Sequence, residues 1–322
     1  MKNILVLGAG GQIGSELVPY LRGIYGTNNV VAADIDKNKC KALAEQGPFE
    51  EINALDGEGF AAVVKKHKID AIYNLVALLS ATGEKDPLLA WKINMGALTN
   101  SLNIAKDNGC AVFTPSSIGA FGNDTPKDNT PQDTLQRSNS TIYGVCKVSG
   151  ELLSDYYFNR FGVDTRSVRF PGIISYVTLP GGGTTDYAVE IYYDAIRKGT
   201  FTSNIAEGTY MDMMYMPDAL NAAVSIMEAD PTRLIHRNSF NIASMSFEPE
   251  QIAAEIKKHI PNFTMDYNVD EVKQTIANSW PNKMDDSCAR AEWDWAPKYD
   301  LTSMTPDMLA KVKEKFEKGL IK

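Results

Sequence analysis

Tyr143 and Lys147 are the residues whose types and spacing most directly suggest chemistry. They lie four positions apart in a stretch with helical patterning, so both side chains would share one face of a helix. A nearby lysine ammonium favours the phenolate form of a tyrosine, and a phenolate is a general base. Such pairs also occur by chance on solvated helix faces, so other residues must support an interpretation as proton-transfer groups.

Ser116 and Ser117 support that interpretation through their position. They follow a short apolar run at residues 111–115, which is typical of a parallel strand. Ligands of doubly wound sheets bind at the carboxyl ends of the strands, so the Ser117 hydroxyl could hold a reacting oxygen beside Tyr143. A serine turn without a ligand is the alternative, and it fits Ser116 better than Ser117. Asn94 stays open between a site residue and a polar helix residue that bonds to backbone or water.

A glycine-rich turn near the start of the sequence predicts a site for a dinucleotide. The turn joins an apolar run at residues 3–7 to a helical pattern at residues 12–23. Glycines permit a tight turn and a close approach to a pyrophosphate, which the N-terminus of the following helix attracts. We expect the cofactor site to include Gly8, Gly10, Gly11, Gln12, Ile13 and Gly14.

Two carboxylates extend the predicted cofactor site. Asp34 ends the second apolar run, twenty positions beyond Gly14. A carboxylate there accepts hydrogen bonds from the adenosine ribose hydroxyls and repels a 2′-phosphate, so we expect NAD rather than NADP. Asp56 follows the third apolar run and is a candidate for binding the adenine amino group. The alternative for Asp56 is an N-cap of a helix over residues 57–67.

These residues need a sheet whose strands end at one edge, and the patterning predicts such a sheet. Short apolar runs alternate with helical patterns, with strands expected at 3–7, 30–33, 49–53, 69–75, 111–115 and 165–170. Helices are expected at 12–23, 36–45, 59–67, 87–107 and 140–161. The alternation predicts an α/β fold of the Rossmann type, a doubly wound parallel sheet with helices on both faces.

The regular alternation of short apolar runs with helical patterns ends beyond Pro171. Helices are expected at 186–198, 217–228, 248–259, 270–277 and 306–318, with a short strand at 240–242. We predict an NAD-binding domain over residues 1–170, to which residues 217–243 return. The remaining segments, 171–216 and 244–322, would form a smaller, discontinuous α/β substrate lobe.

Composition excludes several classes of protein. The 322 residues carry 32 Lys+Arg and 40 Asp+Glu, a formal charge of −8, and have no long basic run. This balance argues against nucleic acid or an anionic membrane as partner. No stretch reaches the ~18 apolar residues of a membrane span, so we expect a cytoplasmic protein. Four scattered cysteines are expected to be reduced, and three dispersed histidines do not suggest a metal site.

Together these motifs resemble the extended short-chain dehydrogenase/reductases over nearly the whole chain. The glycine turn, Asp34, the turn at residues 74–77, Ser117 and the Tyr143/Lys147 pair fall where that family has them. The resemblance implies a catalytic triad of Ser117, Tyr143 and Lys147. It also implies that the NAD site includes Leu75, Ala77, Ile173, Tyr143 and Lys147.

Three further segments, at residues 77–84, 179–189 and 279–290, resemble the L-threonine 3-dehydrogenases of that superfamily. The implied reaction is NAD-dependent oxidation of the threonine 3-hydroxyl to 2-amino-3-oxobutyrate, in threonine catabolism toward glycine. The implied substrate-binding residues are Ser80, Ser117, Tyr143, Thr184, Thr185 and Trp280. An N-cap role for either threonine and a lobe-packing role for Trp280 stay open.

The resemblance also implies a homodimer, formed through the two long helices at 87–107 and 140–161. Apolar residues suited to such contacts, or to the core, are Leu98, Leu102, Leu152 and Tyr156. The methionine-rich stretch at 210–216 departs from many relatives and is expected to fill gaps in the core.

Two other functions compete with this interpretation. A sugar-nucleotide epimerase or dehydratase on the same fold would supply arginines to a substrate diphosphate. Residues 181–218 contain only Arg197 and Lys198 as cations, and both are expected on an outward helical face. A non-catalytic NAD-sensing protein could dispense with the tyrosine and lysine that this sequence has.

Overall fold

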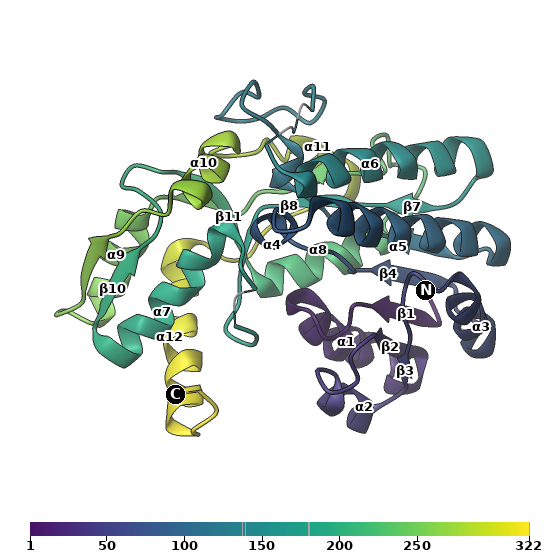
Figure 1. The fold of residues 1–322 in the computed structure, drawn as a ribbon, viewed down its shortest axis with the longest axis horizontal. Coiled ribbons are helices and arrows are strands. Elements are labelled where there is room, and N and C mark those ends of the chain that lie inside the picture. The colour runs from purple at the N-terminus through teal and green to yellow at the C-terminus, as the bar shows by residue number, and fades with distance from the viewer. Residues whose placement is uncertain (137, 139, 180, 322) are drawn as a thin grey trace.

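The computed structural model describes residues 1–136, 138, 140–179 and 181–321, and Figure 1 shows their arrangement. A six-stranded sheet has the strand order β3-β2-β1-β4-β5-β7, and every pairing in it is parallel. Its strands are β1 (Ile4–Leu7), β2 (Val30–Asp34), β3 (Phe49–Glu51), β4 (Ala71–Asn74), β5 (Ala111–Phe113) and β7 (Thr165–Arg166). Leu7 is in register with Ala33 and Asn74, so the loops after β1, β2 and β4 leave from one edge. The predicted Rossmann-type α/β fold is confirmed.

Helices cover both faces because the side chains of each strand alternate in direction. Ile4 and Val6 join a core that includes residues of α1 (Gln12–Tyr25) and α8 (Met216–Glu228). Leu5 and Leu7 join the opposite core, to which helices on the other face contribute. Those helices are α3 (Gly57–His67), α5 (Pro87–Asn108) and α6 (Ile142–Phe161). The short helix α2 (Lys41–Gln46) packs beside α1.

A second group of elements surrounds a separate core, toward the left of Figure 1. One sheet consists of β9 (Gly172–Ile174), β11 (Met211–Tyr215) and β13 (Met245–Phe247), and a second pairs β10 (Thr200–Ser203) with β14 (Thr264–Tyr267). The helices there are α7 (Tyr187–Lys198), α9 (Pro249–His259), α10 (Glu271–Ser279) and α12 (Leu301–Glu317). Met211, Met213, Met214 and Met216 are all buried, which confirms the expected core role of the methionine-rich stretch.

The predicted strand at 165–170 consists of two strands. Ser167 interrupts the run. Its N–H donates to the Arg237 carbonyl at 3.4 Å, and its own carbonyl accepts from the Phe240 N–H at 3.1 Å. After this interruption β8 (Val168–Phe170) pairs with β6 (Ser116–Ser117) and β12 (Phe240–Asn241) instead of continuing the large sheet. Ser117 therefore lies in a separate three-stranded sheet, with the strand order β12-β8-β6.

Two features of the C-terminal part differ from the prediction. Helix α12 begins at Leu301 rather than near Pro306, because the Asp300 carboxylate accepts from the Ser303 N–H at 2.7 Å and caps the helix earlier. Helix α11 (Ser287–Trp293) has no counterpart in the prediction. Its Trp293, together with Trp295, packs in the first core, although the predicted boundary places both in the second lobe.

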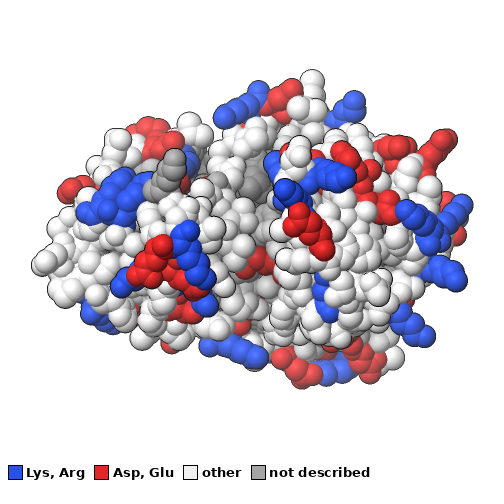
Figure 2. Space-filling view, turned by 90° about the horizontal axis from the view of Figure 1, so that it is seen from below, with Lys and Arg blue, Asp and Glu red and all other residues white. Residues whose placement is uncertain are grey.

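On the face in Figure 2 acidic and basic side chains are intermingled rather than segregated by sign. The helices of the described residues include none with the length and apolar character needed to cross a membrane. The four cysteines are free thiols, as expected. Leu98 and Leu102 belong to the core, whereas Leu152 is 64% and Tyr156 53% exposed.

Candidate active site

A cavity of about 280 Å³ opens at the carboxyl edge of the large sheet, where it meets the second lobe. Fifteen of the eighteen predicted site residues line it, and Gly10, Asp34 and Asp56 do not. The lining contains Gly8, Gly11, Gln12, Ile13, Gly14, Leu75, Ala77, Ser80, Ser117, Tyr143, Lys147, Ile173, Thr184, Thr185 and Trp280. Residues far apart in the sequence therefore share one cavity.

The backbone of the glycine turn between β1 and α1 lines the cavity at Gly8, Gly11 and Gly14. Gly8 has a φ of 73°, a left-handed conformation that favours glycine. A Cβ on Gly14 would lie 2.4 Å from the Gly8 carbonyl oxygen, so α1 approaches the turn as closely as only glycine allows. Gly11 is the N-cap of α1 without a side-chain cap, and the first turn holds no acidic residue. The helix thus presents free N–H groups and a positive dipole end, which fit a pyrophosphate.

Asp34 holds the glycine turn from the end of β2. Its carboxylate accepts from the Gly10 N–H at 2.9 Å and from the Asp36 N–H at 3.0 Å. Gly10 and Asp34 therefore support the rim of the site without lining the cavity. Asp56 is exposed and caps α3, accepting from the Gly59 N–H at 3.1 Å, which is the alternative that the sequence left open. An adenine-binding role for Asp56 stays a prediction.

Ser117, Tyr143 and Lys147 meet in the cavity. Helix α6 begins at Ile142, where the Thr141 hydroxyl accepts from the Gly144 N–H at 3.0 Å, so Tyr143 lies in its first turn. Lys147 follows one turn later, with its Nζ 5.2 Å from the centroid of the Tyr143 ring. Nζ donates to the Pro115 carbonyl at 2.6 Å, which ties the lysine to the strand end that carries Ser117.

The Ser117 hydroxyl is arranged as a donor toward the cavity. Its Oγ accepts from the Gly119 N–H at 3.1 Å and caps the short 3-10 helix that follows. Because a hydroxyl has one donor and two acceptor positions, the proton remains available to a ligand oxygen. The triad therefore offers one base candidate, one hydroxyl donor and one ammonium in a single cavity.

The other residues expected at a substrate, Ser80, Thr184, Thr185 and Trp280, also line the cavity. Ser80 begins the short helix α4 (Ser80–Gly83), and Thr184 and Thr185 lie in a 3-10 turn before α7. The Thr184 Oγ1 is buried and has no hydrogen-bond partner among the described residues. Neither threonine caps α7, because that helix has no side-chain cap. Trp280 is buried and joins the second core while also lining the cavity.

The glycine-rich segment before α7 is held by a carboxylate. The N–H groups of Gly182 and Gly183 donate to the Asp186 Oδ2 at 2.9 and 2.7 Å. These bonds hold the segment that leads to Thr184. Pro180 of this motif lies outside the described residues.

Sequence reasoning missed a buried ion pair beside the catalytic candidates. Glu151 lines the cavity, and its Oε2 lies 2.9 Å from the Arg169 Nη2. The same carboxylate accepts from the Ser116 hydroxyl and from Gln136. Glu151 follows Lys147 by one helical turn, and that spacing could have revealed it. Asn94 bonds both backbone groups of Leu78, which is the alternative of a polar helix residue, and a role in the site stays a prediction although Asn94 also lines the cavity.

Comparison with known proteins agrees with this geometry. The model of the NAD dependent epimerase/dehydratase family matches residues 4–243. An uncharacterized epimerase/dehydratase of Staphylococcus haemolyticus is 56% identical, over 98% of this chain and 99% of its own.

Solved structures extend the likeness. The L-threonine dehydrogenase from Clostridium difficile has a TM-score of 0.96 and 57% identity, covering 98% of each chain. A monomeric L-threonine 3-dehydrogenase from a metagenome has a TM-score of 0.91 and 40% identity, covering 97% of this chain and 99% of its own.

The glycine turn that lines the cavity and the family match together identify the cofactor as NAD. The predicted superfamily resemblance is also confirmed. With its Rossmann-type sheet and its lined cavity, the chain belongs to the NAD dependent epimerase/dehydratase family.

Proposed function

We propose that this chain oxidises L-threonine at the 3-hydroxyl to 2-amino-3-oxobutyrate, using NAD, in threonine catabolism toward glycine. The likeness to the Clostridium difficile enzyme supports this proposal. One observation carries it: among the described residues that line the cavity, Lys147 is the one cationic side chain.

That observation separates the proposal from a sugar-nucleotide function. A nucleotide sugar brings a diphosphate, which proteins commonly bind with arginines. Arg197 and Lys198 are exposed on α7, where Arg197 donates to Asp194 at 2.8 Å, and neither lines the cavity. A small zwitterion needs no second cation beyond Lys147 there. It needs short donors and acceptors, which the hydroxyls of Ser80 and Thr184 provide.

The chain would contribute proton transfer and orientation. NAD, when bound, supplies the acceptor for the hydride that leaves threonine C3. Tyr143 as phenolate takes the proton from the 3-hydroxyl, while Ser117 donates a hydrogen bond to the same oxygen. Lys147 uses one N–H on the Pro115 carbonyl and keeps its others for the nicotinamide ribose and for charge stabilisation of Tyr143.

The remaining site residues divide between substrate and cofactor. Thr184 is the strongest substrate candidate, since its buried hydroxyl has no protein partner in the described structure. We assign Ser80, Thr185 and Trp280 to the same substrate. The glycine turn, Leu75, Ala77 and Ile173 would hold the dinucleotide, and Asp34 would bind its adenosine ribose from the rim.

Replacing Tyr143 with phenylalanine tests the proposal. Loss of a general base costs about 10²–10⁴-fold in turnover, so Tyr143→Phe is expected to abolish most L-threonine-dependent NADH formation. Tyr156→Phe is the matched control, because Tyr156 is a half-exposed residue of the same helix and does not line the cavity. Near wild-type turnover of Tyr143→Phe at alkaline pH would contradict the base assignment.

We also propose a homodimer formed through α5 and α6. Several apolar side chains of these helices are exposed: Leu88, Leu89, Trp91, Leu152, Tyr156 and Phe161. Burial of such a surface against a second copy stabilises association. Light scattering after gel filtration is expected to give a dimer for the wild type and a monomer for Leu152→Glu. A wild-type monomer, as named for the metagenomic relative, would refute the dimer.

The domain division follows as a proposal from the two main cores. Residues of α8 and β12, within 217–243, pack in the first core with β1 and α1. Residues of α7, α9 and α12 share the second core with β11 and β13. We infer an NAD-binding domain of 1–170 with 217–243, and a substrate lobe of 171–216 and 244–322 from which α11 returns to the first core.

A further inference from the structure

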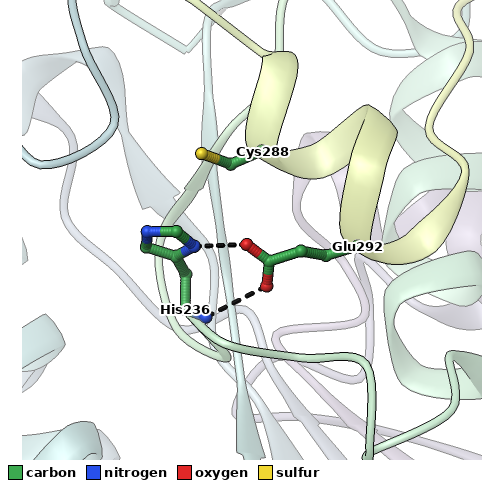
Figure 3. Close-up of side chains that lie close together, drawn as sticks. All are labelled: His236, Cys288 and Glu292. Atoms are coloured by element: carbon green, nitrogen blue, oxygen red, sulfur yellow. Dashed lines mark hydrogen bonds and ion pairs between the residues drawn. The ribbon is translucent and has the colours of Figure 1, made fainter.

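Three potential metal ligands meet outside the cavity: His236, Cys288 and Glu292 (Figure 3). One ligand atom from each lies within 4.8 Å of the other two. Zinc binds nitrogen, oxygen and sulfur at about 2.0–2.3 Å, which places tetrahedral ligands about 3.3–3.8 Å apart. Closure by about 1 Å, well within side-chain movement, would complete such a site.

Helix α11 and the segment before β12 position these groups. Cys288 and Glu292 lie four positions apart on α11 and therefore share one face, toward His236 (Figure 3). The Glu292 Oε2 accepts from the backbone N–H groups of Ile235 at 2.6 Å and His236 at 3.1 Å. Its other oxygen, Oε1, faces the His236 ring. The carboxylate is thus fixed in place before any ion binds.

The imidazole of His236 is oriented from both sides. Its Nδ1 bonds to the Glu292 Oε1, and its Nε2 lies 3.3 Å from the Asp133 Oδ2. Histidine ligands of metals commonly bond their second ring nitrogen to a carboxylate, which fixes the tautomer. When an ion replaces the proton between Nδ1 and the Glu292 oxygen, the remaining proton on Nε2 is directed to Asp133, and Nδ1 is free to bind the ion.

We propose that His236, Cys288 and Glu292 form a zinc site, with Nδ1, Sγ and Oε1 as ligands and water as the fourth. The mixed nitrogen, sulfur and oxygen donors suit zinc, whereas Mg²⁺ and Ca²⁺ prefer oxygen alone. On binding, the Cys288 thiol releases its proton to solvent, and so does the hydrogen bond between the His236 Nδ1 and the Glu292 Oε1, so that the imidazole keeps only the proton on Nε2. The ion would link α11 to the segment preceding β12, which is a structural role because the cavity lies elsewhere.

Histidine spacing could not reveal this cluster, because its members come from segments far apart in the sequence. The alternative is that His236 and Glu292 form only a hydrogen bond. In that alternative Cys288 only packs against the first core, and the protein has no preference for zinc.

Titration of the chelator-treated full chain with Zn²⁺, and with Co²⁺ as a coloured substitute, tests the proposal. We expect one zinc per chain and a thiolate-to-cobalt absorption band. Cys288→Ser should remove the band and weaken zinc binding more than tenfold, and Asp133→Asn should weaken it by about 10–100-fold. His259→Gln is the matched control, since His259 is exposed on α9 and should leave both unchanged.

The fold of each variant is checked by its melting temperature in the presence of chelator. Zinc should then raise the melting temperature of the wild type and of His259→Gln, but not that of Cys288→Ser. Equal zinc affinities of the wild type and Cys288→Ser, or cobalt binding without a thiolate band, would overturn the proposal and show adventitious binding only.

Discussion

Glu16 is predicted to make the stability of this protein fall as pH rises from 4.5 to about 7. The residue lies on α1, and its carboxyl oxygen accepts from the Ser175 hydroxyl at 2.5 Å. Burial raises the pKa of Glu16 from 4.5 to about 7, against the lowering effects of the Ser175 bond and the Lys315 ammonium. Lys315 donates to the carbonyls of Tyr176 and Val177, so the charges gather where α1, α12 and the chain after β9 meet.

The magnitude follows from linkage. The difference between about 7 and 4.5 is about 2.5 units, and at 1.36 kcal/mol per unit it amounts to about 3 kcal/mol. Between these pH values the folded chain holds a proton that the unfolded chain releases. Stability from Glu16 is therefore fully present below pH 4.5 and is lost as pH rises to about 7. Glu16→Gln keeps a neutral group beside Ser175 and should remove this loss.

Urea unfolding of the wild type and Glu16→Gln between pH 4.5 and pH 8 measures the effect. We expect similar free energies of unfolding at the acid end and an advantage of about 2–3 kcal/mol for the variant at pH 8. Glu207→Gln is the control, because Glu207 is exposed and should give no pH-dependent difference. A difference between wild type and Glu16→Gln that stays constant across this range would show that Glu16 does not cause the pH dependence.

Three further predictions concern packing, cofactor choice and the buried ion pair. Gly14→Ala should cost about 1–3 kcal/mol in urea unfolding, because its Cβ would meet the Gly8 carbonyl, and a neutral result contradicts the close approach. Asp34→Ala should lower the ratio of kcat/KM for NAD over NADP at least about tenfold, since the carboxylate repels a 2′-phosphate; an unchanged ratio excludes that role. Arg169→Leu should destabilise by about 3–5 kcal/mol in the same unfolding assay, because the Glu151 carboxylate would stay buried without its cationic partner, and a loss under 1 kcal/mol would contradict this.

The first half of the fold could be predicted because its strands and helices carry strong, ordinary patterns. Helix α5 has an Asp86 cap and Pro87 at its start, and a left-handed Gly109 at its end, so both bounds can be read from the sequence. Helix α2 was expected to begin at residue 36 but begins at Lys41. The Asp36 side chain accepts from the Asn38 N–H at 3.0 Å, and such local bonds compete with helix formation.

The second lobe was harder to predict because its strands are short or, in β11, buried on both faces. All five residues of β11 are buried, so the strand shows no period of two. Its methionines indicated core packing without indicating a strand. The paired strands β10 and β14 are short, and most of β14 is exposed. The sequences of β10 and β14 therefore do not differ enough from that of a loop to be recognised as strands.

The residues of the candidate site likewise divide into those that local spacing predicts and those that only the fold brings together. Tyr143 and Lys147 could be predicted because one helix fixes their spacing. Glu151 and Arg169 come together only through tertiary packing, and so do the ligands of the proposed zinc site. The sequence left Asp56 between two roles, and the structure shows the helix cap. Pairings that depend on the fold of distant segments are absent from local patterns.

Substrate specificity decides between oxidation of L-threonine and conversion of a nucleotide sugar. The purified chain is mixed with NAD and either L-threonine or a nucleotide sugar such as UDP-glucose, and NADH absorbance and sugar products are followed. We expect sustained NADH formation with L-threonine and no conversion of the nucleotide sugar. Conversion of the nucleotide sugar without threonine turnover, or NAD binding without turnover of either, would contradict this expectation.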